Sequence, residues 1–218
     1  EDQIGESFMV HDKKYFANFL LLYVQIIKNY MNNILVSGME FKMICPDHGV
    51  IWRQNPAKII EAYARWCQQV PEKKAVVIYD TMWQSTEKMA EAIAAGINEE
   101  GVPTKPLHLR KCHRSEVMTE VFDAKAIVVG GPTLNNGLFP SVADFLCYMK
   151  GLKPLNKIGA AFGSYGWSGE STKIITKELK EMKFDMIDPG LKIQYVPDKQ
   201  GLENCYEYGR KIGKAVNG

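Results

Sequence analysis

The stretch Asp80-Thr81-Met82-Trp83-Gln84-Ser85-Thr86 decides the fold, because it joins two segments with different hydrophobic patterns. The residues before it, 75–79, form an uninterrupted apolar run that is typical of a strand buried on both faces. The residues after it, 87–98, place apolar side chains at helical spacing. The stretch is therefore predicted to be the turn between a buried strand and the N-terminus of a helix.

Such a turn offers unpaired backbone N–H groups and the positive end of a helix dipole, which favour a bound phosphate. The stretch contains neither Gly-x-Gly-x-x-Gly nor Gly-Lys-Ser/Thr, and hydroxyl side chains replace the glycines and the lysine of those motifs. We therefore expect a phosphate monoester held by hydrogen bonds without a balancing cation. The alternative is a simple helix cap, with Ser85 or Thr86 as the N-cap residue, and the stretch alone does not separate the two.

The composition narrows the class of protein. A length of 218 residues fits one or two domains, and a net charge of +2 gives no reason to expect a nucleic-acid or membrane partner. The most apolar run, residues 19–27, is well short of the ~20 residues that a membrane-spanning helix needs. The five cysteines are scattered without a Cys-x-x-Cys pair, which favours reduced thiols and a cytoplasmic location.

Residues 73–218 alternate strand and helix patterns. Apolar runs predict strands at 75–79, 105–109, 126–130, 158–162 and 191–195. Helical spacing predicts helices at 86–99, 115–122, 141–150, 170–182 and 202–216. Strands rich in Val and Ile that alternate with helices predict an α/β fold: a doubly wound, five-stranded parallel sheet covered by helices on both faces.

Residues 1–72 follow a different pattern. They predict one long helix over 13–32, a short strand over 41–45, and a helix over 56–69 with Pro56 in its first turn. One strand and two helices do not make a stable sheet alone. We therefore expect residues 1–72 to be the end of another domain, whose earlier part is absent from this chain. The boundary is expected at Val70-Pro71-Glu72.

Three loops are expected at one edge of the sheet of residues 73–218, because ligands of doubly wound sheets bind beyond the carboxyl ends of the strands. The first is 80–86, the second is 131–140 and the third is 163–170. Taken singly, the second reads as an Asn-Gly turn and the third as a glycine-rich connector. Together they supply hydroxyls for a phosphate, backbone and Asn groups for a heterocycle edge, and the rings of Tyr165 and Trp167 for stacking.

These motifs resemble flavodoxin, which carries FMN on three such loops, and more specifically the flavodoxin-like C-terminal domain of flavodiiron proteins, also called A-type flavoproteins. The resemblance is carried by residues 81–90, 131–135 and 163–169 and covers all of 73–218. It implies an FMN site with its phosphate on the first loop and the flavin ring on the other two. The implied FMN-binding residues are Thr81, Met82, Trp83, Gln84, Ser85, Thr86, Pro132, Thr133, Leu134, Asn135, Asn136, Gly137, Ser164, Tyr165, Gly166, Trp167, Ser168 and Gly169.

The N-terminal segment resembles the same family. Residues 45–53, Cys-Pro-Asp-His-Gly-Val-Ile-Trp-Arg, resemble the end of its metallo-β-lactamase-like domain, where an Asp-His-Gly carries the last histidine ligand of a di-iron centre. The resemblance implies that His48 is a former or potential iron ligand. The family's His-x-Glu-x-Asp-His motif is absent from this sequence, so we expect the di-iron centre only in the intact protein.

The resemblance also implies a function. In the intact family, electrons from a small donor such as rubredoxin reach FMN and then a di-iron site that reduces oxygen to water or nitric oxide to nitrous oxide. The two sites of one chain lie far apart, so a homodimer that brings the FMN of one subunit to the iron of the other is expected. The sequence does not choose between oxygen and nitric oxide. Because the flavin loops lack Asp and Glu before Glu170, we expect a less negative potential for the second electron than in acidic flavodoxins.

Two alternatives remain at this point. A stand-alone flavodoxin-like NAD(P)H:acceptor reductase shares the fold and FMN, but needs a pocket for the nicotinamide, for which the sequence shows no separate motif. A receiver-like interaction module needs an acidic cluster after the first strand and a suitably placed phosphoacceptor aspartate; Asp80 alone gives it little support, and Trp83, Ser85 and Thr86 fit FMN better.

Overall fold

The computed structural model describes residues 7–187 and 189–218, so the first six residues of the N-terminal segment lie outside the described part. The chain divides between Val70 and Pro71 into two compact units. No helix of the described residues is both long enough and apolar enough to cross a membrane.

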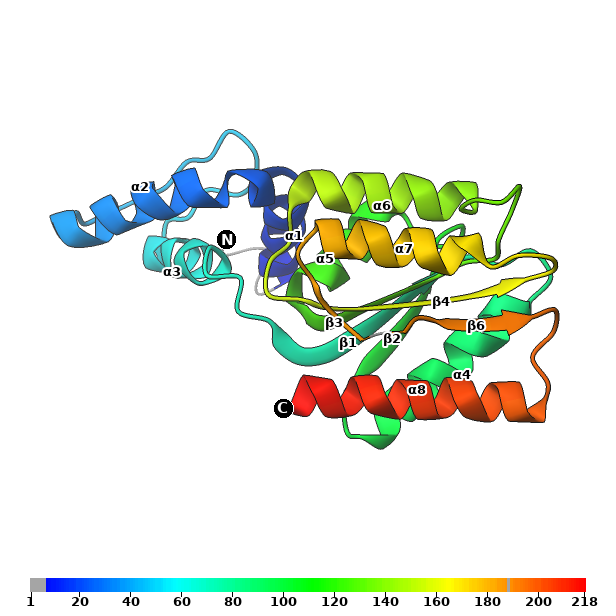
Figure 1. Cartoon of the computed structure of the whole chain (residues 1–218). Helices are drawn as coiled ribbons and strands as arrows, with labels where there is room; N and C mark the ends of the chain where they lie inside the picture. Colours follow the sequence, from blue (N-terminus) through cyan, green and yellow to red (C-terminus); the bar gives the residue numbers. More distant parts are fainter. Residues whose placement is uncertain (1–6, 188) are drawn as a thin grey trace. The chain divides into compact units, whose positions relative to one another are not determined.

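The second unit is built on a parallel sheet in the order β2-β1-β3-β4, with a fifth position beside β4 (Figure 1). Its first four strands are β1 (Glu72–Tyr79), β2 (Thr104–His108), β3 (Ala124–Gly130) and β4 (Ile158–Tyr165). The strand order reverses between β1 and β3, so a crevice opens at their carboxyl ends. This arrangement confirms the predicted doubly wound parallel fold.

The fifth position differs from the prediction of a single strand at 191–195. Two short strands share it: β5 (Asp185–Met186) pairs with the start of β4, and β6 (Leu191–Gln194) pairs with its end. The described sheet therefore has six strands rather than five. Pro189 lies between them and has no N–H to donate to the ladder, which explains why one continuous strand does not form.

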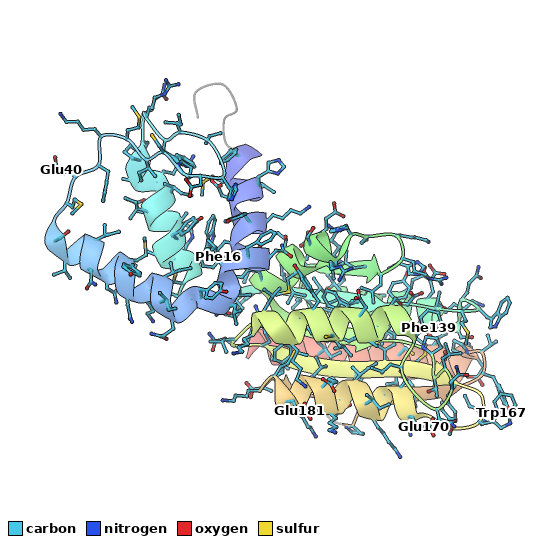
Figure 2. All side chains as sticks on the ribbon, turned by 90° about the horizontal axis from the view of Figure 1, so that it is seen from above. Phe16, Glu40, Phe139, Trp167, Glu170 and Glu181 are labelled. Carbon is cyan, nitrogen blue, oxygen red and sulfur yellow. The ribbon has the colours of Figure 1, made fainter. Side chains whose placement is uncertain are left out.

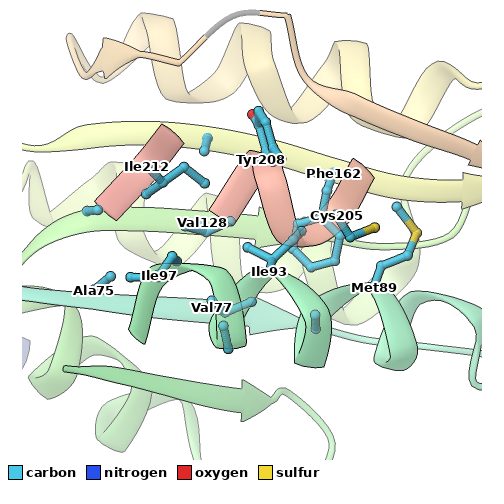
Figure 3. Close-up of a cluster of buried hydrophobic side chains, with 14 of the residues drawn as sticks. Ala75, Val77, Met89, Ile93, Ile97, Val128, Phe162, Cys205, Tyr208 and Ile212 are labelled. Atoms are coloured by element: carbon cyan, nitrogen blue, oxygen red, sulfur yellow. The ribbon is translucent and has the colours of Figure 1, made fainter. Parts of the chain in front are cut away.

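Helices cover both faces of this sheet (Figure 1). One face carries α4 (Ser85–Glu99) and α8 (Lys199–Asn217), and the other carries α5 (Arg114–Asp123), α6 (Pro140–Leu152) and α7 (Glu170–Glu181). Figure 3 shows the core between the sheet and the first pair, where side chains such as Val77, Ile93 and Ile212 are fully buried. Because the strands are covered on both faces, their apolar residues run without alternation.

The described part of the first unit contains helices and one irregular stretch, residues 38–55, and its structure differs from two predictions. The helix predicted over 13–32 is interrupted: α1 (Ser7–Tyr15) and α2 (Val24–Ser37) flank a π-helical turn, Phe16–Leu20, and a 3-10 turn, Leu21–Tyr23. The interruption lets Phe16 and Leu21 both be buried in the core of the first unit. There the centre of the Phe16 ring lies 5.4 Å from that of Trp66 in α3 (Pro56–Trp66).

The strand predicted over 41–45 is wrong. In its place the structure has a single antiparallel bridge between Ile44 and Trp52, with N···O distances of 3.0 and 2.9 Å. The described residues 7–70 hold no other strand to extend it, so the apolar pattern has no ladder to join.

Candidate functional site

A pocket of about 660 Å³ lies at the carboxyl ends of β1, β3 and β4, a size typical of small-molecule sites. Figure 2 shows Trp167 and Phe139 at this end of the second unit. The three loops that the sequence places at this edge meet around it. The pocket is lined by fourteen of the eighteen residues proposed from the sequence: Thr81, Met82, Trp83, Ser85, Pro132, Thr133, Leu134, Asn135, Asn136, Ser164, Tyr165, Gly166, Trp167 and Ser168.

The other four, Gln84, Thr86, Gly137 and Gly169, support the loops instead of lining the pocket. Gln84 is the N-cap of α4 and Gly169 is the N-cap of α7. Thr86 is buried, and its Oγ1 lies 2.9 Å from Oγ of Ser164. Gly137 exchanges two backbone hydrogen bonds with Leu134.

Two lining residues, Tyr195 and Val196, were missed by the sequence reasoning. They follow β6, and the Tyr195 N–H donates to the carbonyl of Tyr165 at 2.7 Å. The signal was present, because the rule that places the other loops at the carboxyl ends of strands applies equally to the last strand.

The first loop has unused hydrogen-bonding capacity. Gln84, with a φ of 67°, is the N-cap of α4 and makes no side-chain capping bond, so the alternative of Ser85 or Thr86 as the cap is wrong. The first N–H groups of the helix therefore keep their capacity for a ligand. The Thr81 side chain is 5% exposed, and its Oγ1 has no hydrogen-bond partner among the described residues. A buried hydroxyl beside a helix N-terminus fits a phosphate monoester.

Asp80, the first residue of this loop, is fully buried. Its carboxylate accepts hydrogen bonds from the Thr81 N–H at 2.6 Å, His108 Nε2 at 3.0 Å, Arg110 Nε at 2.9 and 3.1 Å, and the Ser141 hydroxyl. Burial alone raises the pKa of Asp80, but these donors outweigh it and hold the pKa below its usual value. An enclosed carboxylate with these partners is not an accessible phosphoacceptor, which removes the receiver-like alternative.

The second loop is a tight turn at the pocket wall. Asn135 and Asn136 both have positive φ, 49° and 56°, and Leu134 and Gly137 bond across them, as in a type I′ turn. The turn is fixed to the third loop, because the Thr133 N–H donates to the carbonyl of Ser164 at 2.9 Å. The pocket wall on this side is therefore ordered by backbone bonds between loops.

Planar side chains stand at the rim of the pocket. Trp83 is 85% exposed and Trp167 is 96% exposed, while Tyr165 is partly buried with Lys192 6.0 Å above its ring. Large aromatic surfaces left in water on two different loops fit contact with a planar ring system. The described lining residues carry no charged side chain, so the ring would sit among neutral groups.

His48 lies in the first unit, exposed, with its ring 6.1 Å from that of Tyr15. The described residues contain no group of three or more His, Cys, Asp or Glu side chains that could hold a metal ion. The assignment of His48 as an iron ligand therefore remains a prediction.

The family model, the related sequences and the solved structures that match this chain agree with one another. The flavodoxin family matches residues 77–209. The chain is 42% identical over 218 residues to a nitric oxide reductase of Moorella thermoacetica, covering 99% of this chain and 55% of that protein. The structure matches the rubredoxin oxygen:oxidoreductase of Desulfovibrio gigas with a TM-score of 0.96 and 40% identity, over 100% of this chain and 55% of that one.

A second solved structure, the flavodiiron protein from Giardia intestinalis, matches with a TM-score of 0.89 and 32% identity, over 96% of this chain and 52% of that one. The chain thus spans about half the length of the relatives it matches. Flavodoxin domains take FMN, a phosphate monoester joined to a planar ring, which is the chemistry of the pocket. The chain therefore belongs to the flavodoxin family, in the form that this family takes in the C-terminal portion of flavodiiron proteins.

Proposed function

We propose that this chain is the FMN-dependent electron-transfer part of a flavodiiron oxygen or nitric oxide reductase. The observation that carries the proposal is the buried hydroxyl of Thr81, which has no partner among the described residues. It lies beside the N-terminus of α4, which has no side-chain capping bond, in a pocket with exposed aromatic rings at its rim. Bound FMN supplies the redox chemistry, and the protein binds and orients it.

Different residues would bind different parts of FMN. Thr81 and Ser85, with the N–H groups at the start of α4, would hold the phosphate. The turn at Asn135 and Asn136 would meet the polar edge of the ring with amide and backbone groups. Trp167 would cover part of a ring face and exclude water from it.

Flavin titration of the purified apo chain tests this proposal. Quenching of flavin fluorescence should show one FMN per chain, and riboflavin, which lacks the phosphate, should bind at least ~10-fold more weakly, because the phosphate bonds are lost. A chain that binds neither flavin contradicts the proposal.

The electron donor is proposed to be a rubredoxin-like protein, supported by the name of the Desulfovibrio gigas relative, rubredoxin oxygen:oxidoreductase. The test mixes FMN-loaded chain with reduced rubredoxin, and in parallel with NADH alone, and follows the flavin absorbance. Fast bleaching by rubredoxin and slow bleaching by NADH are expected. Fast bleaching by NADH alone would instead favour the stand-alone NAD(P)H:acceptor reductase.

The acceptor is proposed to be a di-iron centre in the half of the relatives that this chain does not match. His48 would supply one ligand, and the missing N-terminal half, from the same protein or a partner subunit, would supply the rest. Metal analysis should find flavin without iron in the chain alone, and iron after coexpression with that half. Iron uptake that is unchanged in His48→Ala would contradict the assignment of His48.

A cytoplasmic location is proposed, because the five cysteines are all free.

A homodimer is proposed for the complete protein. The first unit leaves apolar side chains in water, among them Phe19, Ile26 and Tyr30, each more than half exposed. In the chain alone, such surface should cause association or a rearranged contact. The homodimer of the complete protein is proposed because the flavin and iron sites of one chain would lie far apart. Sedimentation of the chain coexpressed with the missing half should give a dimer, and a strict monomer would contradict the proposal.

A further inference from the structure

We propose that Asp80 and Arg110 are positioning residues for the phosphate of FMN: together they clamp the backbone of Thr81 and so aim its hydroxyl at the phosphate. This inference rests on the proposed function of the pocket. Neither residue lines the pocket. Both act on the ligand through Thr81.

The clamp grips Thr81 from both sides of its backbone. The Asp80 carboxylate accepts the Thr81 N–H at 2.6 Å, and Nη2 of Arg110 donates to the Thr81 carbonyl. The two residues are also bonded to each other, since Arg110 Nε lies 2.9 and 3.1 Å from the two carboxylate oxygens. The donor and the acceptor of Thr81 are thus fixed by one ion pair, and only its side-chain hydroxyl lacks a partner among the described residues.

Other parts of the sheet edge hold the clamp itself. His108, at the end of β2, and Ser141, in the first turn of α6, both bond to the Asp80 carboxylate. The guanidinium carbon of Arg110 lies 5.6 Å from the centre of the Phe139 ring, at the end of the second loop. The position of Thr81 is therefore fixed by contacts from β2, α6 and the second loop, as well as by its own loop.

Stability alone does not account for this arrangement. Burying a carboxylate is costly, and apolar residues of similar size often stabilise a fold as well as a buried ion pair does. The clamp also holds the Thr81 hydroxyl without a described partner in a buried position, which costs free energy in the ligand-free protein. A hydrogen bond from the Thr81 hydroxyl to a phosphate oxygen would recover that free energy. A hydroxyl that is already fixed in position also loses less entropy on binding.

Arginine is needed at this position for a geometric reason. Its planar guanidinium reaches the carboxylate with Nε and the carbonyl with Nη2 at the same time. Lysine keeps the charge but has a single nitrogen, so it does not reproduce that fork. Arg110→Lys therefore opens the clamp while retaining the positive charge. The matched control is Arg114→Lys, because Arg114 is similarly exposed, 51% against 55%, and forms a surface pair with Asp144.

The test compares the dissociation constants of FMN and riboflavin, by fluorescence quenching, for the wild type and both variants. Arg110→Lys should weaken FMN binding about tenfold and change riboflavin binding less than about twofold, because only FMN carries the phosphate. Arg114→Lys should change neither. If Arg110→Lys leaves the ratio of the FMN and riboflavin dissociation constants unchanged, the inference is overturned. A wild type that binds no FMN would instead overturn the proposed function.

A double-mutant cycle with Thr81→Val separates positioning from general damage. If the clamp acts through the Thr81 hydroxyl, Arg110→Lys should have almost no further effect on FMN affinity once that hydroxyl is gone. If the losses of FMN affinity from the two single substitutions multiply in the double variant, the inference is contradicted. Asp80→Asn, which removes the charge that holds Arg110, should give the same loss of preference for FMN. If Asp80→Asn does not fold, the cycle with the half-exposed Arg110 decides the question.

Discussion

The hydroxyls of Thr86 and Ser164 lie 2.9 Å apart in the buried interior, and this contact joins the first turn of α4 to the end of β4. It therefore ties the first loop, 80–86, to the third loop, 163–170. Thr86→Val should lower the free energy of unfolding by about 1–3 kcal/mol, because Ser164 loses its partner without a change in volume. Urea denaturation measures the loss.

Two controls sharpen this prediction. The double variant Thr86→Val/Ser164→Ala should recover part of the stability, because replacing both partners removes the unsatisfied group. Thr176→Val removes a hydroxyl that bonds to a carbonyl of its own helix, at 2.8 Å, and should cost less than ~1 kcal/mol. A double variant less stable than Thr86→Val would show that the contact does not act as a pair.

Gly163, in the third loop, packs tightly against the backbone of Gly131 in the second loop. A Cβ added there would lie 2.4 Å from the carbonyl oxygen of Gly131, so Gly163→Ala must displace the second loop. We expect a loss of about 1–3 kcal/mol in stability and a clear loss of FMN affinity. Gly151 in α6 is the matched control, since a Cβ there meets nothing within 4 Å. Gly151→Ala should leave FMN binding intact and raise stability by up to ~1 kcal/mol.

The burial of Lys157 should make the free energy of unfolding depend on pH. Its side chain is 2% exposed, and Nζ donates to the carbonyls of Phe122 and Ala124 at 2.8 and 2.7 Å. Burial lowers the pKa of Lys157 from 10.5 to about 7, although Asp123 opposes the shift. Between these two values the unfolded chain binds more protons than the folded one, so this group's contribution to stability grows as the pH rises and is lost as the pH falls to 7.

The measurement is the free energy of unfolding at several pH values in the wild type and in Lys157→Met. The wild type should gain stability relative to the variant between about pH 7 and pH 10, because titration of the other groups cancels in the comparison. The variant should lack this component. Parallel pH profiles for the two proteins would mean that Lys157 is charged in the folded state.

The neutral lining of the pocket predicts how easily bound FMN is reduced. Negative charge near a flavin opposes the addition of electrons, and the described lining has no charged side chain. Leu134→Glu should therefore make the potential for the second electron more negative by tens of millivolts. Leu134→Gln, of the same shape without the charge, should shift it much less. Potentiometric titration that gives equal shifts for both would contradict this explanation.

The sequence predicts the second unit well, because its strands and helices alternate with clear apolar patterns. It fails where tertiary contacts decide the local structure. The interrupted helix around Phe16 depends on packing that no local pattern records, and β5 is only two residues long, too short to give a recognisable apolar run. The role of Thr86 was also hidden, since a buried hydroxyl that bonds to Ser164 has the same sequence signature as a ligand or a cap.

The clamp on Thr81 illustrates the same limit. Asp80 reads as part of the turn, and Arg110 lies 30 residues away after another strand, so nothing in the sequence couples them. The parallel sheet brings them together, because β1 and β2 are neighbours that end at the same edge. Residues that support a site from behind are therefore harder to predict than those that line it.

The pocket and its clamp draw on the ends of β1, β2, β3, β4 and β6. A ligand that binds only the folded state there stabilises the folded chain by mass action, to a degree set by its concentration relative to its dissociation constant. Newly made chains that have not yet met the cofactor are then the ones most exposed to proteolysis. The amount of this protein in a cell should accordingly follow the supply of flavin, with no need for a change in its synthesis.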